Sequence, residues 1–146
     1  MSGFKLDIDS VERDEDRVEF LSACSKLDAR IIRNLVDVKG VDVGTAVDGL
    51  GQNAIHFVAV SSAYDPERQI SLIGYLIQQG ANVNQPRTSD GWTPLFLAVT
   101  FGLQPIVNAL LQSGAKTRVK DYLEMTPEDY ADRFRMKQIK DMLVHR

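Results

Sequence analysis

The sequence predicts an all-α solenoid, in which helix–turn–helix units stack side by side and short hairpin-like turns connect them. The dipeptide Thr93-Pro94 returns as Thr126-Pro127, 33 positions later, and a step of this length is typical of stacked repeats. Each dipeptide is followed by a short apolar stretch with small residues on one side and then by a second, amphipathic stretch. These two observations favour repeats over one closed core.

Two earlier segments fall into the same frame. Residues 51–59 (GQNAIHFVA) align with residues 91–99 (GWTPLFLAV), and a more degenerate copy begins near residue 20. The 146 residues therefore hold about four units, which suffices because each unit of an array buries its core against its neighbours.

The hydrophobic pattern predicts four pairs of helices, at 16–26 and 28–38, 54–62 and 66–79, 94–101 and 105–113, and 127–134 and 136–144. Pro94 and Pro127 fit the first turn of their helices, where no N–H is needed. Pro66 and Pro105 mark the starts of two second helices in the same way.

Side chains that start and end these helices can also be assigned. Thr93 and Thr126 are expected to cap the two helices that begin with proline. Gly80 and Gly114 are expected to end their helices in the left-handed conformation.

The sequence resembles ankyrin repeats. The resemblance is carried by residues 90–102 (DGWTPLFLAVTFG), 110–115 (LLQSGA) and 77–84 (IQQGANVN), and it extends over about residues 15–144. It implies an ankyrin-repeat domain at 15–146, a solenoid whose repeats lie at approximately 15–47, 48–87, 88–120 and 121–146. Residues 1–14 are acidic and are interpreted as a loose tail or a capping segment. Asp14 and Asp16 are expected at the N-terminus of the first helix, where carboxylates favour the helix dipole.

His56 is predicted to be structural. The resemblance implies that its ring nitrogens tie adjacent repeats together. Phe96 and Glu128 are taken to stand at the corresponding positions of the next two repeats, so a uniform ladder of hydrogen bonds is not expected. The only other histidine is His145, and no P-loop, HExxH or GxSxG motif is present. We therefore expect no enzyme, no cofactor and no metal site.

Composition restricts the partners. The formal net charge is −3 and no basic stripe is present, which disfavours nucleic-acid binding. The sequence has no apolar run of the roughly 18 residues that span a membrane and no signal peptide at its start. The single cysteine, Cys24, fits a reducing compartment. We expect a monomer in the cytoplasm, the nucleus or both, with no membrane partner.

The second repeat is longer than the others. From Ala54 to Pro94 the step is 40 residues, seven more than 33, and six of the extra residues fall between its two helices, around residues 61–69. Insertions in loops are tolerated thermodynamically, so sequence drift and a functional role both remain open.

The resemblance implies that a protein partner binds the turn tips and the exposed positions of each first helix, which line a concave face. Trp92 is interpreted as a recognition residue rather than a packing residue. The predicted partner-binding residues are Leu50, Gln52, Val60, Ser61, Tyr64, Ser89, Asp90, Trp92, Thr100, Phe101, Tyr122, Met125, Arg133 and Phe134. In the alternative, the last repeat is a cap that folds its apolar residues inward, which weakens Tyr122 and Phe134 more than Trp92 and Phe101.

Two functions fit this face. The first is an adaptor or scaffold that binds a peptide segment or a domain of another protein. The alternative is a stoichiometric inhibitor or regulatory subunit of an enzyme such as a kinase.

Asn84 also resembles the asparagine that is hydroxylated in many ankyrin repeats.

Overall fold

The structure is a computed structural model that describes residues 7–145. This part of the chain forms eight α-helices and no strand, which confirms the predicted all-α class. The helices are α1 (Ile8–Ser25), α2 (Ala29–Asp37), α3 (Ala54–Ala59), α4 (Pro66–Gln78), α5 (Pro94–Thr100), α6 (Gln104–Gln112), α7 (Pro127–Arg133) and α8 (Lys137–Val144). None of these eight helices combines the length and the apolarity that crossing a bilayer requires.

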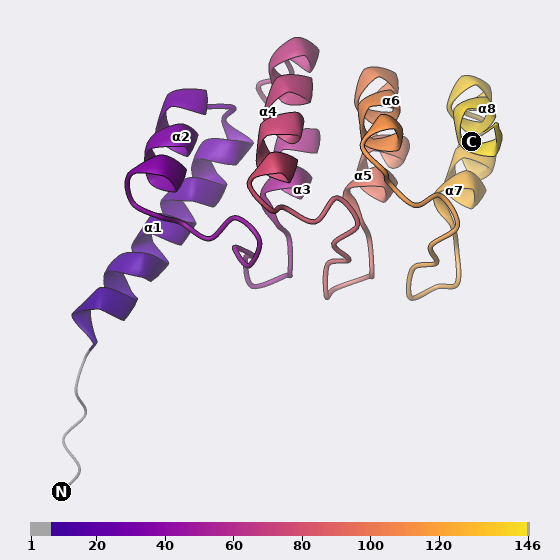
Figure 1. Cartoon of the computed structure of the whole chain (residues 1–146). Helices are drawn as coiled ribbons and strands as arrows, with labels where there is room; N and C mark the ends of the chain where they lie inside the picture. The colour runs from indigo at the N-terminus through magenta and orange to yellow at the C-terminus, as the bar shows by residue number, and fades with distance from the viewer. Residues whose placement is uncertain (1–6, 146) are drawn as a thin grey trace, which may run out of the picture.

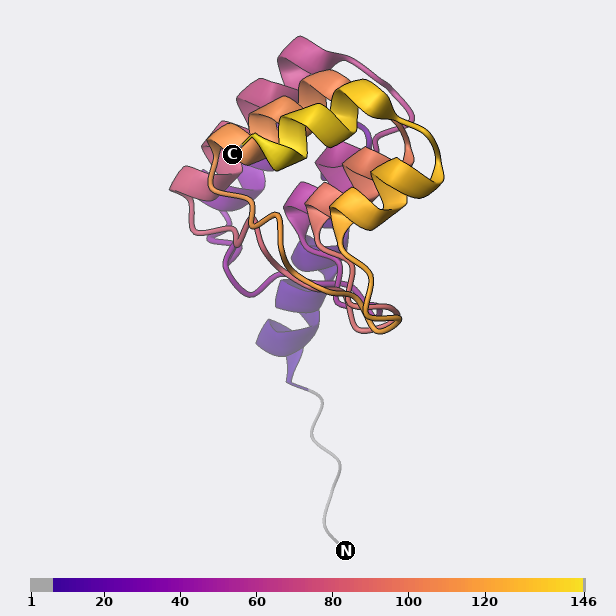
Figure 2. The same cartoon turned by 90° about the vertical axis from the view of Figure 1, so that its right-hand side faces the viewer.

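The helices form four antiparallel pairs that stack in sequence order (Figure 1). The first helices of the pairs, α1, α3, α5 and α7, make one layer, and the second helices, α2, α4, α6 and α8, make the other (Figure 2). The turn tips that connect successive pairs project beside the first layer. The core lies between the two layers, where Phe96, Ile106 and Leu110 of the third pair are fully buried.

The first helix is longer than the sequence indicated. It begins at Ile8 rather than near residue 16, so of the two alternatives for residues 1–14, a loose tail or a capping segment, the loose tail is wrong from Ile8 onward. Residues 1–6 lie outside the described residues. Asp9 is the only acidic residue in the first turn, and Asp14 and Asp16 lie in the body of the helix. The helix dipole therefore does not explain their presence.

The two predicted threonine caps differ. Thr126 accepts a hydrogen bond from the N–H of Asp129, and the Asp129 carboxylate accepts one from the N–H of Thr126. Asp129, not Glu128, thus occupies the position that corresponds to His56. Thr93 makes no such bond, and its buried hydroxyl has no partner among the described residues. The prediction that its side chain caps α5 is wrong. Phe96, at the paired position, has no polar group to return a bond to the N–H of Thr93, so neither half of a capping box forms.

The predicted glycine caps are confirmed. Gly80 and Gly114 have φ values of 105° and 93°, and hydrogen bonds from Ala81 to Leu76 and from Ala115 to Leu110 close the helix ends. This is the Schellman pattern. α7 closes in the same way, although the left-handed position is held by Arg135, with a φ of 58°.

His56 joins the second repeat to the third. Its ring Nδ1 accepts a hydrogen bond from the N–H of Asn53 at 3.1 Å, and its Nε2 donates to the backbone oxygen of Trp92 at 2.9 Å. The predicted structural role is therefore confirmed. Burial of the ring lowers its pKa from 6.5 to about 4, because desolvation disfavours the charged imidazolium.

The extra length of the second repeat lies partly in a helix. α4 has 13 residues, whereas α6 has nine, so it is one turn longer and extends past its neighbours (Figure 1). The connection before it is held by Gln69, which is fully buried. The Gln69 amide donates to the backbone oxygen of Val58 and accepts from the N–H of Asp65.

Gly102 ends α5 with a φ of 70°, as Arg135 ends α7 with a φ of 58°, so these two caps give a matched test of backbone strain. A left-handed φ costs a residue with a side chain about 1–2 kcal/mol. Glycine avoids this cost, but its larger conformational entropy in the unfolded chain cancels part of the advantage. We expect Arg135→Gly to raise the free energy of unfolding by about 0.5–1 kcal/mol and Gly102→Ala to lower it by a similar amount. A Cβ at Gly102 would lie 3.8 Å from the nearest atom, Met136 Cε, so no clash obscures the comparison. Urea denaturation measures both, and equal shifts in the same direction would contradict the assignment.

His56 predicts a dependence of stability on pH. Its pKa is lower in the folded state than the ordinary 6.5, so its contribution is complete above pH 6.5 and is lost as the pH falls toward 4. Between pH 7 and pH 5 we expect a loss of about 2 kcal/mol in the free energy of unfolding. His56→Phe should be less stable at pH 7 but should lack this part of the slope. Urea denaturation at the two pH values compares them, and identical slopes would exclude His56 as the source.

Candidate protein-binding face

The turn tips and the first-layer helices meet at an angle and form one face of the array (Figure 2). Neighbouring tips are joined through their backbones. The N–H of Thr88 donates to the oxygen of Leu50 at 2.7 Å, and the N–H of Tyr122 donates to the oxygen of Asp90 at 2.9 Å. The tips of the second, third and fourth repeats therefore form a continuous row.

Carboxylates hold each tip in shape. Asp48 accepts hydrogen bonds from the N–H groups of Leu50 and Gln52, and Asp121 accepts from those of Leu123 and Met125. Both aspartates stand five positions before the residue that begins the following helix as its N-cap. The shared spacing is a sequence signal that could have identified them.

The third tip is held by an ion pair as well as by hydrogen bonds to a carboxylate. The Arg87 guanidinium contacts both carboxylate oxygens of Asp90, at 2.7 and 2.9 Å, and its third nitrogen donates to the side chain of Gln52 in the preceding tip. Burial alone would raise the pKa of Asp90, but the bonds from Arg87 and from the N–H of Trp92 outweigh burial and lower it. Gln52 and Asp90, both predicted partner-binding residues, thus also connect the tips.

Trp92 is a packing residue, contrary to the prediction. Its side chain is half-buried. The ring stacks on Phe96 at 5.9 Å between centroids and meets Tyr130 edge-on at 5.2 Å. Its indole N–H donates to Asp121 at 2.9 Å. A position at a turn tip does not imply exposure here, because the aromatic ring of the next repeat covers it.

Asp121 is the buried acceptor that collects these contacts. It receives hydrogen bonds from Tyr130, from the Trp92 indole and from the backbone of its own tip. Burial by itself would raise its pKa, but the donated bonds, led by that of Tyr130, hold the pKa below its ordinary value. The carboxylate therefore stays charged and joins the third repeat to the fourth. Neither Asp121 nor Tyr130 was predicted from the sequence.

The predicted partner-binding residues divide by exposure. Seven are exposed: Leu50, Tyr64, Ser89, Phe101, Tyr122, Arg133 and Phe134. Six are half-buried: Gln52, Val60, Asp90, Trp92, Thr100 and Met125. Ser61 is buried, and its hydroxyl donates to the backbone oxygen of Ser25. The prediction that Ser61 is available to a partner is therefore wrong.

Of the four exposed aromatic residues in this set, Tyr64 lies in the second repeat and the other three lie toward the C-terminal end of the array. Phe101 is 65% exposed at the end of α5, Phe134 is 51% exposed at the end of α7, and Tyr122 is 65% exposed at the fourth tip. The cap alternative, in which the apolar residues of the last repeat fold inward, is wrong for Tyr122 and Phe134. Of the two residues that it weakened less, Phe101 is exposed and Trp92 packs.

Asn84 lies between the second and third repeats and bridges them. Its side-chain oxygen accepts from the N–H of Lys116 at 2.8 Å, and its amide nitrogen donates to the oxygen of Gly114 at 3.2 Å. These bonds give it a structural role. Its hydroxylation remains a prediction from the sequence.

Residues 20–121 match the family of ankyrin repeats (3 copies). Palmitoyltransferase AKR1 of Kluyveromyces lactis is 29% identical over 120 residues, which are 82% of this chain and 15% of that protein. Human transient receptor potential cation channel subfamily A member 1 is 28% identical over 116 residues, 71% of this chain and 10% of that protein. Mouse rabankyrin-5 is 36% identical over 72 residues, 42% of this chain and 6% of that protein.

This chain thus spans 15% or less of the length of these relatives. Ankyrin repeats generally mediate protein–protein interaction. The match at 20–121 covers more than half of the sequence, and the chain belongs to the ankyrin-repeat family.

Proposed function

We propose that the chain is a protein–protein interaction module that binds a peptide segment or a domain of another protein through the concave face of repeats two to four. One observation carries this proposal. Phe101, Tyr122 and Phe134 are large aromatic side chains at the turn tips and at the ends of first-layer helices, and each is more than half exposed. An exposed group of apolar side chains on a folded protein typically marks an interaction site.

The packing beneath these side chains supports the role. The Phe134 ring stacks on Tyr130 at 6.3 Å between centroids, and Tyr130 is fixed by Asp121 and Trp92. A rigid exposed ring loses little conformational entropy when a partner covers it. Tyr122 lies over Gly91, where a Cβ would come within 2.9 Å of its ring, so this side chain also has a fixed support.

The test begins with capture of partners on immobilised wild-type protein, with the double variant Phe101→Ala/Phe134→Ala as the reference. Proteins that bind the wild type and not the variant are candidates, and titration with the purified candidate gives the affinity. An activity assay on that partner then separates an adaptor from a stoichiometric inhibitor of an enzyme such as a kinase. Retention of the same proteins by both baits would contradict the proposal.

Substitutions of the exposed rings should lower the affinity for a partner, whereas substitution of the packed Trp92 ring should lower the stability of the fold. Phe101→Ala and Phe134→Ala remove exposed rings, so we expect a loss of about 2 kcal/mol each in binding, roughly thirtyfold. The melting temperature should be nearly unchanged for Phe101→Ala and slightly lower for Phe134→Ala, because the Phe134 ring stacks on Tyr130. Trp92→Ala removes a ring that packs between repeats and should lower the free energy of unfolding by about 2–4 kcal/mol. Calorimetry of binding and thermal denaturation measure the two effects. Equal melting temperatures for Trp92→Ala and the wild type would contradict the packing role.

A further inference from the structure

The N-terminal helix carries an apolar stripe that faces away from the core. Val11 and Val18 stand seven positions apart on one side of α1, and Val18 is 63% exposed. Phe20 and Cys24, which pack into the core, lie on the opposite side of the helix. This stripe therefore makes no contribution to the core of the array.

Two hollows meet at this stripe, and they share Val18 and Ser22. One, of about 450 Å³, lies between α1, the second turn tip and α3. The other, of about 520 Å³, runs along α1. The first is also lined by Leu21, Val47 and Phe57, and the second by Val11, Glu15 and Glu19. Together they form a shallow groove with an apolar floor, which we call the α1 groove.

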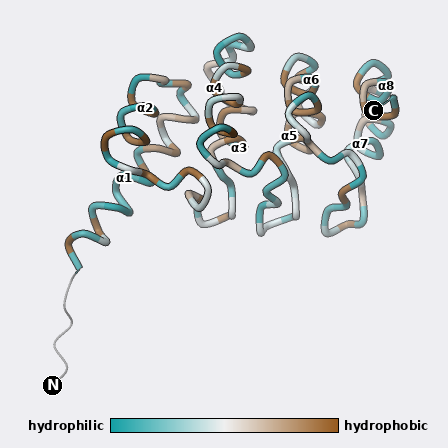
Figure 3. Tube along the Cα trace, viewed as in Figure 1, coloured by the Kyte–Doolittle hydropathy of each residue, from teal (hydrophilic) through white to brown (hydrophobic). Residues whose placement is uncertain are grey.

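The rim of the α1 groove is acidic. Glu15 and Glu19 stand four positions apart on the same side of the helix, and neither forms an ion pair within the described residues. Like charges at this spacing destabilise a helix. Neither residue lies in the first turn, so the helix dipole does not compensate for them. Figure 3 shows the N-terminal half of α1 as mostly hydrophilic, interrupted by hydrophobic segments.

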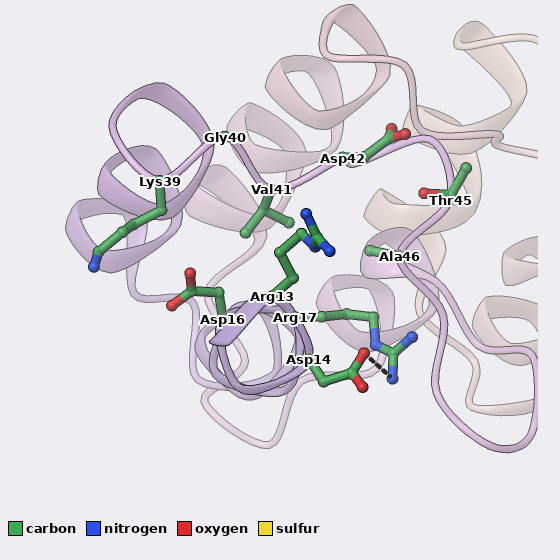
Figure 4. Close-up of a pocket in the computed structure, with 10 residues that line it drawn as sticks. All are labelled: Arg13, Asp14, Asp16, Arg17, Lys39, Gly40, Val41, Asp42, Thr45 and Ala46. Carbon is green, nitrogen blue, oxygen red and sulfur yellow. Dashed lines mark ion pairs between the residues drawn. The ribbon is translucent and has the colours of Figure 1, made fainter. Parts of the chain in front are cut away.

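Arg17 also lines the first hollow of the α1 groove, beside Asp48, but both arginines of α1 are paired with other carboxylates. Arg13 and Arg17 line a hollow of about 260 Å³ between α1 and the segment 39–46 (Figure 4). Arg17 is paired with Asp14 at 3.3 Å, and Arg13 lies 3.8 Å from Asp7. The carboxylates of Glu15 and Glu19 are therefore not neutralised by the arginines of their own helix.

We propose that the α1 groove binds a basic amphipathic segment of a partner protein. Aliphatic side chains of that segment occupy the hollows around Val18, and its Lys or Arg side chains pair with Glu15 and Glu19. Charge complementarity selects this occupant, because the same rim repels acidic segments, nucleic acid and anionic membranes. The inference goes beyond the proposed function, since the α1 groove belongs to the first repeat and to the tip that follows it.

The test uses the whole chain and a fluorescent model helix made of Leu and Lys, with its apolar residues on one face. A Leu and Glu helix of the same pattern and a scrambled Leu and Lys peptide are the reference ligands. Anisotropy titrations compare the wild type with Val18→Ser, Glu15→Gln/Glu19→Gln and Phe101→Ala. Val18, Glu15 and Glu19 are exposed, and melting temperatures confirm that each variant remains folded.

The expected result is that only the amphipathic Leu and Lys helix binds, and that binding weakens as salt rises from about 50 to 300 mM. Val18→Ser and Glu15→Gln/Glu19→Gln should each weaken it by about fivefold or more, whereas Phe101→Ala should not change it. Equal binding of the scrambled peptide, or wild-type affinity in both groove variants, would overturn the proposal. Loss of binding in Phe101→Ala alone would assign the peptide to the aromatic face instead, which overturns the α1 groove and leaves the proposed function intact.

Discussion

The contact between neighbouring repeats is the constraint on which the rest of the structure depends, because two short helices cannot bury a core by themselves. Three kinds of bond meet at this contact. Backbone hydrogen bonds join the tips, His56 joins the second repeat to the backbone of Trp92, and Trp92 and Tyr130 share the carboxylate of Asp121. Each tip is therefore fixed by its neighbour as well as by its own turn.

This arrangement explains why the tips can present side chains in a fixed geometry. Loops on a protein surface are ordinarily mobile, and a binding surface built from them must be ordered when the partner arrives. Here Asp48, Arg87 and Asp121 satisfy the polar groups of the turns. The backbone beneath Tyr122 is consequently in place before any partner binds.

Local signals were sufficient to predict the fold. Pro94, Pro127, Gly80 and Gly114 constrain the backbone by themselves, so their roles could be predicted from the sequence alone. The role of Trp92 could not, because it depends on Asp121 and Tyr130, which lie 29 and 38 positions later in the chain. The repeat pattern placed Trp92 at a turn tip, but it did not show which side chains cover the Trp92 ring. The start of α1 was misplaced because its first turns bury no side chain. Ile8, Val11 and Val18 are exposed, and the buried residues of the helix begin at Phe20.

The two ends of the array contact different interfaces between repeats, and this determines how binding at each end would affect stability. In a linear array each repeat contacts only its neighbours, so stabilisation of one interface has little effect on a distant one. A ligand over Phe134 rests on Tyr130 and thereby on the interface between repeats three and four. A ligand in the α1 groove contacts α1, Phe57 and the second tip, which border the interface between repeats one and two. The interface between repeats two and three lies between the α1 groove and Phe134, so ligands at these two proposed sites would bear on different interfaces of the array.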